Sequence, residues 1–529
     1  MSEIRNYLDY VYGLSRPSGR GGRPGAGGDP ALRLAMIRLA GLAKTFELAA
    51  GESLHYRPLR PRLTRLSLEL KKLAGSAPDA GQAAGAVMRA LDGLPLTTPE
   101  ELAAKPESFL AVPQDAVEGL VSAPTSGSLG PSKRIFSSKN DLESVVKFFQ
   151  FGMRNVLGAS PRATGAGRLR NPPEEPPAID DPAPFVPDLR RDGVTLLMSG
   201  TRPGSVGGLL TEALRRWSTP CLVMGFLPAG RADREKYLAE LAKNRTGCLV
   251  GLPSQLVRVA RTIRRPAGLR SVLLSGECAP PGLVGALQAE WGVEVFVHYG
   301  LAEFGLGGAV ECGRHTGPHL RDGDMLAEIL DENGRRLPPG REGEIVLTSL
   351  SREAMPLIRY RTGDLGLVPA GPCPCGSALS RLVVLGRKSD QATLPDGGTL
   401  RLADLASALY RIKGLTGFSA RYSADPAPEL TLQVGVGDPA PGKKKGAADG
   451  GRETSGRETG GKTTAELVRK AVGRELGLKL QVKVKVSREG PSPAPGGAKQ
   501  TLAAGREQDP RLVPASLRGT SDNRDNRDS

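Results

Sequence analysis

Between residues 194 and 300 the chain alternates short apolar runs with segments of helical length, and this alternation restricts the fold more than any other feature. Apolar runs separated by helices are typical of parallel strands joined by crossover helices. We therefore predict a parallel sheet covered by helices. The expected strands are 194–198, 221–226, 248–252, 271–274 and 293–297, and the expected helices include 206–217 and 233–243.

Ligands on such sheets bind beyond the carboxyl ends of the strands, where the connecting loops lie. The loop after the fourth expected strand begins Ser275-Gly276-Glu277. The loop after the fifth reads His298-Tyr299-Gly300-Leu301-Ala302-Glu303. These two loops are therefore the first candidates for a binding site.

The pattern changes on both sides of this region. Residues 1–110 place apolar side chains at helical spacing, which predicts a helical lead-in. After residue 325, short alternating runs at 325–330, 344–350 and 357–360 predict a small β subdomain. After residue 386 we expect an α+β domain with helices 402–412 and 464–476 and strands 419–422, 429–434 and 478–486.

The predicted fold class is therefore α/β: a large multi-part N-terminal domain with parallel sheets and a β subdomain, plus a small mobile α+β C-terminal domain. We place the domains at 111–386 and 387–502. Segments 158–187, 437–462 and 503–529 are rich in proline, glycine and charge without periodicity, which is typical of disorder.

The run Thr125-Ser126-Gly127-Ser128-Leu129-Gly130-Pro131-Ser132-Lys133 has the chemistry of a phosphate-binding loop. Its glycines allow several backbone N–H groups to face one anion, its hydroxyls add donors, and Lys133 adds a positive charge. It is not a Walker loop, because only two residues separate its glycines. The alternative is a solvated Ser/Gly connection.

Bulk properties exclude several classes of protein. The net charge is +16, but the basic residues are scattered and show no aromatic-interleaved patch, which favours attraction of anionic ligands over nucleic-acid binding. No run of 18 apolar residues and no signal peptide is present, so we expect a cytoplasmic protein without membrane spans. Six cysteines in 529 residues argue against a disulfide framework.

Four motifs in register resemble the acyl-adenylate-forming superfamily, and within it the phenylacetate-CoA ligase family. They are the loop 125–133, Tyr299-Gly300-Leu301-Ala302-Glu303, Tyr360-Arg361-Thr362-Gly363-Asp364 and Gly386-Arg387. The resemblance covers roughly residues 94–505. It implies an AMP-forming acid–CoA ligase that joins a small carboxylic acid to ATP as acyl-AMP and then transfers the acyl group to CoA.

The resemblance also implies roles for single residues. The residues that would bind phosphates are Thr125, Ser126, Gly127, Ser128, Gly130 and Lys133. Gly276 and Glu277 would line the adenine and acyl pocket, Tyr299 would pack on adenine, and Gly300 would belong to the same ATP site. Glu303 would help to hold Mg²⁺, Asp364 would accept hydrogen bonds from the ribose, and Arg387 would lie near the nucleotide. Taken singly, Tyr299 also fits a core aromatic residue, Asp364 a turn residue and Glu303 a charge at a helix N-terminus.

The resemblance assigns a catalytic lysine to the loop Gly496-Gly497-Ala498-Lys499. The position of the domain hinge is Ser389, where the family commonly has Asp or Lys, and the run 397–402 lacks the family's Asn and Pro. Two alternatives therefore stay open: an adenylating enzyme with a non-CoA acceptor, and a non-catalytic nucleotide-binding homologue. A homodimer is one expected assembly.

Four cysteine and histidine residues have the chemistry of a zinc site. Glu311-Cys312 is followed by His315 and His319, and then by Cys373-Pro374-Cys375. Some members of the family carry a structural zinc here. We predict Cys312, His319, Cys373 and Cys375 as ligands of a closed structural site, with His315 as the substitute for His319; the alternative is a set of reduced free thiols.

Overall fold

The structure is a computed structural model that describes residues 29–76, 78–123, 133–157, 193–200, 205–425, 427–437, 458–477, 481–487 and 502–504. The expectations for residues 125–130, for Lys499 and for the segments 158–187 and 503–529, apart from Ala503 and Ala504, lie outside the described residues. Among the described helices, none is both long and apolar enough to cross a membrane.

The predicted parallel sheet is confirmed. Its strands pair in parallel in the order β4-β3-β5-β6-β7, and the short antiparallel strands β8 and β9 extend it beyond β7. The strands are β3 (Val194–Leu197), β4 (Cys221–Val223), β5 (Cys248–Gly251), β6 (Ser271–Leu274), β7 (Glu294–Tyr299), β8 (Ala309–Val310) and β9 (His319–Leu320).

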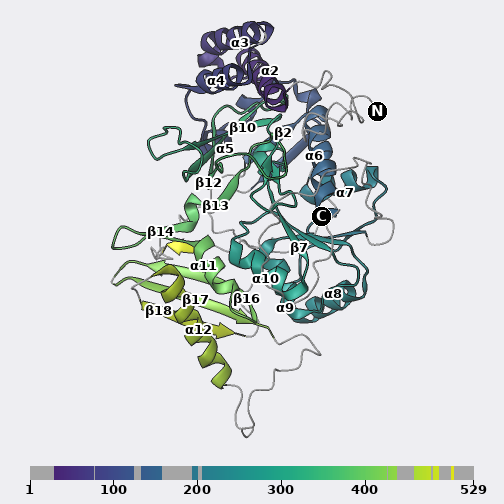
Figure 1. Cartoon of the computed structure of the whole chain (residues 1–529), viewed down its shortest axis with the longest axis vertical. Helices are drawn as coiled ribbons and strands as arrows, with labels where there is room; N and C mark the ends of the chain where they lie inside the picture. Colours follow the sequence, from purple (N-terminus) through teal and green to yellow (C-terminus); the bar gives the residue numbers. More distant parts are fainter. Residues whose placement is uncertain are drawn as a thin grey trace, which may run out of the picture.

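Helices cover both faces of this sheet because successive side chains of a strand point to opposite faces. Phe296 packs with α6 and α7 in one core, while Val295 packs with α8, α9 and α10 in another. Figure 1 shows α8, α9 and α10 gathered beside the sheet. The helices are α6 (Lys139–Leu157), α7 (Val206–Arg216), α8 (Arg231–Lys243), α9 (Pro253–Thr262) and α10 (Pro281–Trp291).

The predicted β subdomain is an antiparallel sheet of order β10-β11-β12-β13. The expected strand 357–360 is wrong. Residues 357–359 are not extended strand, and β12 begins only at Tyr360. Arg359 has a φ of 49°, in the left-handed region, which is incompatible with extended backbone at that point. The strands are β10 (Met325–Leu330), β11 (Gly343–Ser349), β12 (Tyr360–Leu367) and β13 (Val383–Arg387).

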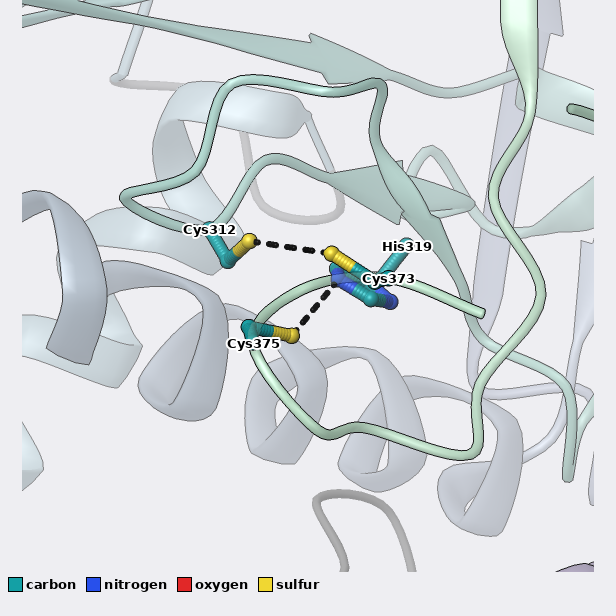
Figure 2. Close-up of side chains that lie close together, drawn as sticks. All are labelled: Cys312, His319, Cys373 and Cys375. Atoms are coloured by element: carbon teal, nitrogen blue, oxygen red, sulfur yellow. Dashed lines mark hydrogen bonds between the residues drawn. The ribbon is translucent and has the colours of Figure 1, made fainter. Parts of the chain in front are cut away.

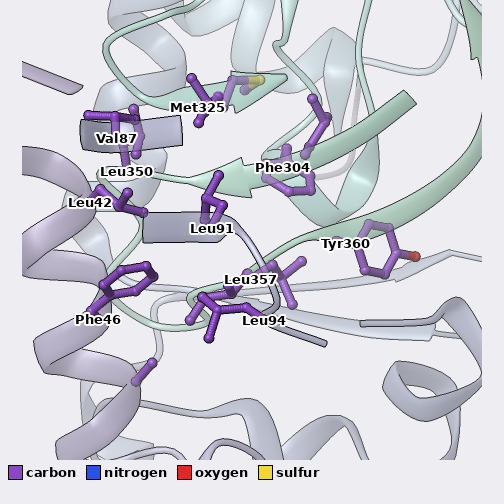
Figure 3. Close-up of a cluster of buried hydrophobic side chains, with 14 of the residues drawn as sticks. Leu42, Phe46, Val87, Leu91, Leu94, Phe304, Met325, Leu350, Leu357 and Tyr360 are labelled. Atoms are coloured by element: carbon purple, nitrogen blue, oxygen red, sulfur yellow. The ribbon is translucent and has the colours of Figure 1, made fainter. Parts of the chain in front are cut away.

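The N-terminal helices pack on this antiparallel sheet. Leu42 and Phe46 of α2 and Leu91 of α4 share a buried core with Leu357 and Tyr360 (Figure 3). The elements are α2 (Pro30–Gly51), α3 (Arg60–Gly75), α4 (Ala80–Leu91), α5 (Pro99–Ala104), and the hairpin strands β1 (Gly119–Ala123) and β2 (Lys133–Ser137). Asp79 begins α4 with a capping box, since its side chain accepts from the Gln82 N–H and Gln82 bonds back to the Asp79 N–H.

The C-terminal part forms a four-stranded sheet of order β18-β17-β16-β19 with two helices. Helix α12 begins at Glu458, so the prediction that disorder extends to residue 462 is wrong at its end. The elements are β14 (Gln391–Thr393), β15 (Thr399–Arg401), α11 (Leu402–Tyr410), β16 (Leu415–Ser423), β17 (Glu429–Val436), α12 (Glu458–Leu476), β18 (Gln481–Ser487) and β19 (Leu502–Ala504).

The C-terminal part docks on α9 and α10 through one continuous apolar core, which includes Leu283 of α10 and Leu409 of α11. Arg261 of α9 crosses this interface. Its buried guanidinium donates hydrogen bonds to the carbonyl oxygens of Tyr410 and Leu415, and so neutralises the carboxyl end of α11. The boundary at residues 386 and 387 stays a prediction, as does the mobility of the C-terminal domain.

We predict that Gly282→Ala destabilises this docked arrangement. A Cβ atom at Gly282 would lie 1.9 Å from the backbone oxygen of Ser407 on α11, so the two helices would have to separate. Overpacking of this kind costs about 1–3 kcal/mol. Gly285→Ala on the same helix is the matched control, because a Cβ atom there meets nothing within 4 Å.

Thermal unfolding followed by circular dichroism measures both variants. The expected result is a lower Tm for Gly282→Ala and an unchanged or higher Tm for Gly285→Ala, since alanine is the better helix former. Equal Tm values for the two variants would contradict the docking described here.

Candidate active site

A cleft of about 880 Å³ lies beyond the carboxyl ends of β6 and β7. Its walls are formed by the loops and helix α10 of the parallel-sheet region, by strands β12 and β13 of the antiparallel sheet, and by helix α11 of the C-terminal part. The cleft brings together six of the predicted nucleotide-binding residues: Gly276, Glu277, Tyr299, Gly300, Asp364 and Arg387. A volume of this size is typical of small-molecule sites.

The loop after β6 is held at the start of helix α9. The carboxylate of Glu277 accepts hydrogen bonds from the backbone N–H and the hydroxyl of Ser254, each at 3.0 Å, and this places a negative charge at the positive end of the helix dipole. Gly276 has a φ of 88°, which favours glycine over other residues. The loop is thus fixed before any ligand binds.

Tyr299, Asp364 and Arg387 form a chain of polar contacts at the cleft, in which Tyr299 and Asp364 are buried and Arg387 is half-buried. The Tyr299 hydroxyl donates to Asp364 Oδ2 at 2.9 Å, and Arg387 Nε lies 3.2 Å from Asp364 Oδ1. Asp364 and Arg387 are opposite each other on the paired strands β12 and β13. Burial, and then the Asp364 charge, raise the pKa of Tyr299 well above its ordinary value, so Tyr299 remains a hydrogen-bond donor.

Glu303, the predicted magnesium ligand, lies in a short 3-10 helix (Ala302–Phe304) that follows β7. Its Oε1 atom accepts hydrogen bonds from Lys133 Nζ and from the Tyr360 hydroxyl, both at 2.7 Å. Burial opposes ionisation of Glu303, but the Lys133 charge and these hydrogen bonds outweigh it and lower its pKa. Glu303 is therefore a carboxylate, and Lys133 from the predicted phosphate loop is its partner.

Sequence reasoning did not identify every residue that lines the cleft. Helix α11 contributes Ala403, Asp404 and Ser407, and the stretch after β8 contributes Glu311 and His315. His298, just before Tyr299, is also part of the lining. The position of His298 at the carboxyl end of a predicted strand was a usable signal, whereas nothing local in the sequence indicates that α11 would face the cleft.

The four predicted zinc ligands lie together, with their ligand atoms all within 4.8 Å of one another (Figure 2). Cys312 Sγ is 3.8 Å from Cys373 Sγ, and Cys375 Sγ is 3.3 Å from His319 Nε2. A tetrahedral zinc with Zn–S bonds of about 2.3 Å places its sulfur ligands about 3.8 Å apart. The residues therefore fit zinc.

The surroundings of the cluster also suit a metal. His319 Nδ1 lies 3.3 Å from the Leu379 carbonyl oxygen, which leaves Nε2 for a metal. Hydrogen bonds from the Cys312 thiol and from the His319 imidazole lower the pKa of Cys375 to about 3, although burial acts in the opposite direction. His315 is not part of the cluster, so the predicted substitute is not needed.

Comparisons with known proteins agree with this geometry. Residues 222–351 match the family described as AMP-binding enzyme. The chain is 30% identical over 213 residues to phenylacetate-coenzyme A ligase of Thermus thermophilus, and 30% identical over 184 residues to that of Aromatoleum evansii. These matches cover 37% and 33% of this chain and 48% and 41% of the two relatives, so the chain spans about half the length of the relatives it matches.

A solved structure of 2-hydroxyisobutyryl-CoA ligase in the postadenylation state, in complex with R3-HIB-AMP, has a TM-score of 0.64 to this chain at 18% identity. The match covers 93% of this chain and 95% of that one, and it confirms the predicted two-part fold. Residues 222–351 carry the AMP-binding match, and the chain as a whole shares the fold of this ligase. The same ligase in the thioesterification state, with 2-HIB-AMP and CoA, gives a TM-score of 0.51 at 18% identity over 85% and 86% of the two chains.

We predict that Cys375→Ser removes bound zinc and lowers stability together. The cluster joins the segment after β8 to the turn between β12 and β13, so the binding energy of the metal is also folding energy for these segments. Metal analysis of the purified protein should give about one zinc per chain for a single closed site. Cys221→Ser, at a half-buried cysteine of β4 outside the cluster, is the control and should keep the metal. A metal-free native protein of full stability would contradict the assignment.

Proposed function

We propose that this protein is an ATP-dependent acid–CoA ligase that forms an acyl-AMP and then a CoA thioester. The observation that supports it most directly is the cleft, which gathers Gly276, Glu277, Tyr299, Gly300, Asp364 and Arg387 from segments up to 111 residues apart (387 minus 276). A family match to AMP-binding enzymes and relatives that are phenylacetate-coenzyme A ligases support the same reaction class.

In this proposal the nucleotide binds to side chains that the protein already holds in position at the cleft. Asp364 accepts hydrogen bonds from the ribose hydroxyls, because a carboxylate offers two acceptor oxygens. Tyr299 and Gly300 pack on adenine, and Arg387 stays beside the nucleotide as the partner of Asp364. Gly300 has no room for a side chain, since a Cβ atom there would lie 1.9 Å from the Leu306 carbonyl oxygen.

In this proposal the phosphates are bound by the predicted loop and by Glu303, which is not among the residues that line the cleft. Thr125, Ser126, Gly127, Ser128, Gly130 and Lys133 surround them, and Glu303 holds Mg²⁺, a hard cation that prefers carboxylate oxygen. Lys133 and Glu303 form an ion pair of 2.7 Å, so the two charges assigned to the phosphates and to Mg²⁺ lie side by side. Mg²⁺ supplies charge neutralisation of the phosphates when bound.

The remaining parts of the proposal follow from the sequence. Lys499 stabilises the adenylation transition state, the cysteine–histidine cluster holds a structural zinc, and CoA is the acceptor. The free cysteines among the described residues favour a reducing compartment, in agreement with a cytoplasmic protein. A homodimer stays a prediction, and sedimentation of the purified protein would test it.

We predict that Asp364→Ala weakens ATP binding about 10- to 100-fold, because hydrogen bonds to a charged group contribute about 1.5–3 kcal/mol each. Asp404→Asn is the matched control: Asp404 lines the same cleft from α11, and we assign it no nucleotide contact. Isothermal titration calorimetry measures both. Equal affinity for ATP in the two variants would contradict the assigned ribose site.

Carboxylate-dependent exchange of pyrophosphate into ATP tests the activity itself. We predict that Lys499→Ala lowers this exchange far more than it lowers thioester formation from preformed acyl-AMP, because the lysine acts only in the first transition state. Equal losses in the two half-reactions would remove Lys499 from catalysis. Binding of ATP without exchange for any acid would favour the non-catalytic alternative, and exchange without CoA-dependent turnover would favour a different acceptor.

A further inference from the structure

Two histidines line the cleft, and each has a buried ring nitrogen without a hydrogen-bond partner among the described residues. They are His298 at the end of β7 and His315 in the loop after β8, and the unpartnered atom is Nε2 in both. Burial of a polar atom without a partner costs free energy, so such atoms need an explanation. The nucleotide roles proposed above use neither histidine.

His315 is oriented by a carboxylate. Glu311 Oε2 lies 3.3 Å from His315 Nδ1 and also accepts a hydrogen bond from the Val297 backbone N–H at 3.0 Å. A carboxylate only accepts hydrogen bonds, so Nδ1 of His315 carries a proton whether the ring is neutral or charged. The free Nε2 atom of His315 therefore requires a polar partner, and a hydroxyl group suits it because it can both donate and accept a hydrogen bond.

The backbone of His315 is strained in a way that holds this orientation. Its φ is 50°, an uncommon value for a residue with a side chain. The turn is fixed by a 3.1 Å hydrogen bond from the His315 N–H to the Cys312 carbonyl, and the ring packs on Phe296 with a centroid distance of 4.8 Å. Strained residues of this kind persist where the surroundings hold them in place, and they are concentrated at ligand sites.

His298 presents a second polar position in an apolar setting. Its Nδ1 atom lies 3.0 Å from the Ser275 hydroxyl, and the rings of Phe148 and Phe149 lie 6.0 and 5.6 Å away. Burial lowers the pKa of His298 to about 4, so its ring is neutral at pH 7 and suits an uncharged polar group. The side chain is only 5% exposed.

We propose that His298 and His315 form the acid-binding part of the cleft, and that the substrate is a carboxylic acid that carries a hydroxyl group. This inference rests on the proposed acid–CoA ligase activity and names its substrate class. A hydroxyl group both donates and accepts, so it can bond to His315 Nε2 in either charge state of that ring and to the neutral ring of His298. An apolar acid such as phenylacetate leaves both nitrogens unpaired, and sites of this kind strongly disfavour such analogues.

Matched acid pairs test the proposal with the full-length wild-type protein. ATP–pyrophosphate exchange is measured with lactate and propionate, 3-hydroxybutyrate and butyrate, 2-hydroxyisobutyrate and isobutyrate, and mandelate and phenylacetate. We expect the hydroxylated member to be favoured by about 100-fold or more in kcat/KM for at least one pair. The members of each pair share a carbon skeleton, so the ratio isolates the hydroxyl group.

Two variants then connect the preference to the histidines. His298→Phe keeps a planar ring without nitrogen, and His315→Asn keeps a residue that tolerates the left-handed backbone but shortens the side chain. Each should reduce the preference about tenfold or more while the Kd for ATP changes less than twofold. Val284→Ala, which lines the same cleft from α10, is the control and should keep the preference.

The outcomes separate this inference from the activity on which it rests. Exchange with apolar acids at rates equal to their hydroxylated partners would overturn the substrate class and leave the ligase activity intact. Loss of ATP binding together with the preference would show that the histidines are structural, and would also overturn the inference. Absence of exchange with every acid, in protein that binds ATP, would overturn the ligase activity itself.

Discussion

The carboxylate of Asp364 connects the two large sheets of this protein. One oxygen accepts the Tyr299 hydroxyl at the end of the parallel sheet, and the other faces Arg387 on the neighbouring strand of the antiparallel sheet. A buried carboxylate requires such partners, because an unpaired charge in a dry site is very costly. The wall formed by β12 and β13 is thereby held against β7, and the cleft lies where they meet.

Much of this arrangement could be predicted from the sequence. The strand–helix alternation predicts the parallel sheet, and the rule that ligands bind at the carboxyl ends of strands identifies Gly276, Glu277 and Tyr299 before any coordinates are known. The four metal-ligand candidates could be chosen because cysteine and histidine are the ligands that zinc prefers. The parallel sheet is confirmed, and the chosen residues lie together in the structure, while their roles in nucleotide and metal binding stay predictions.

The parts that could not be predicted depend on tertiary contacts. The apolar residues 357 and 358 suggested a strand, but the left-handed conformation of Arg359 delays the start of β12. The docking of α11 depends on a close approach at Gly282 and on the hydrogen bonds of Arg261, neither of which has a local signature. His315 resembled a metal ligand by spacing, but Glu311 directs its ring elsewhere.

The cluster of Cys312, His319, Cys373 and Cys375 and the cleft are mechanically connected. His315 is held by the Cys312 carbonyl, and the Thr316 hydroxyl lies 3.4 Å from Cys373 Sγ, while both residues line the cleft. A metal bound in the cluster would therefore order the loop that carries His315. Under the two proposals, two of the candidate metal ligands, Cys312 and His319, lie on the same loop as the proposed acid-binding residue His315.

The most direct measurement is a crystal structure of the protein with a non-hydrolysable acyl-AMP analogue, such as an acyl-sulfamoyl adenosine. The account predicts adenine against Tyr299, both ribose hydroxyls bonded to Asp364, and the acyl group directed toward His298 and His315. Density for the nucleotide outside this cleft, or a ribose without contact to Asp364, would contradict it.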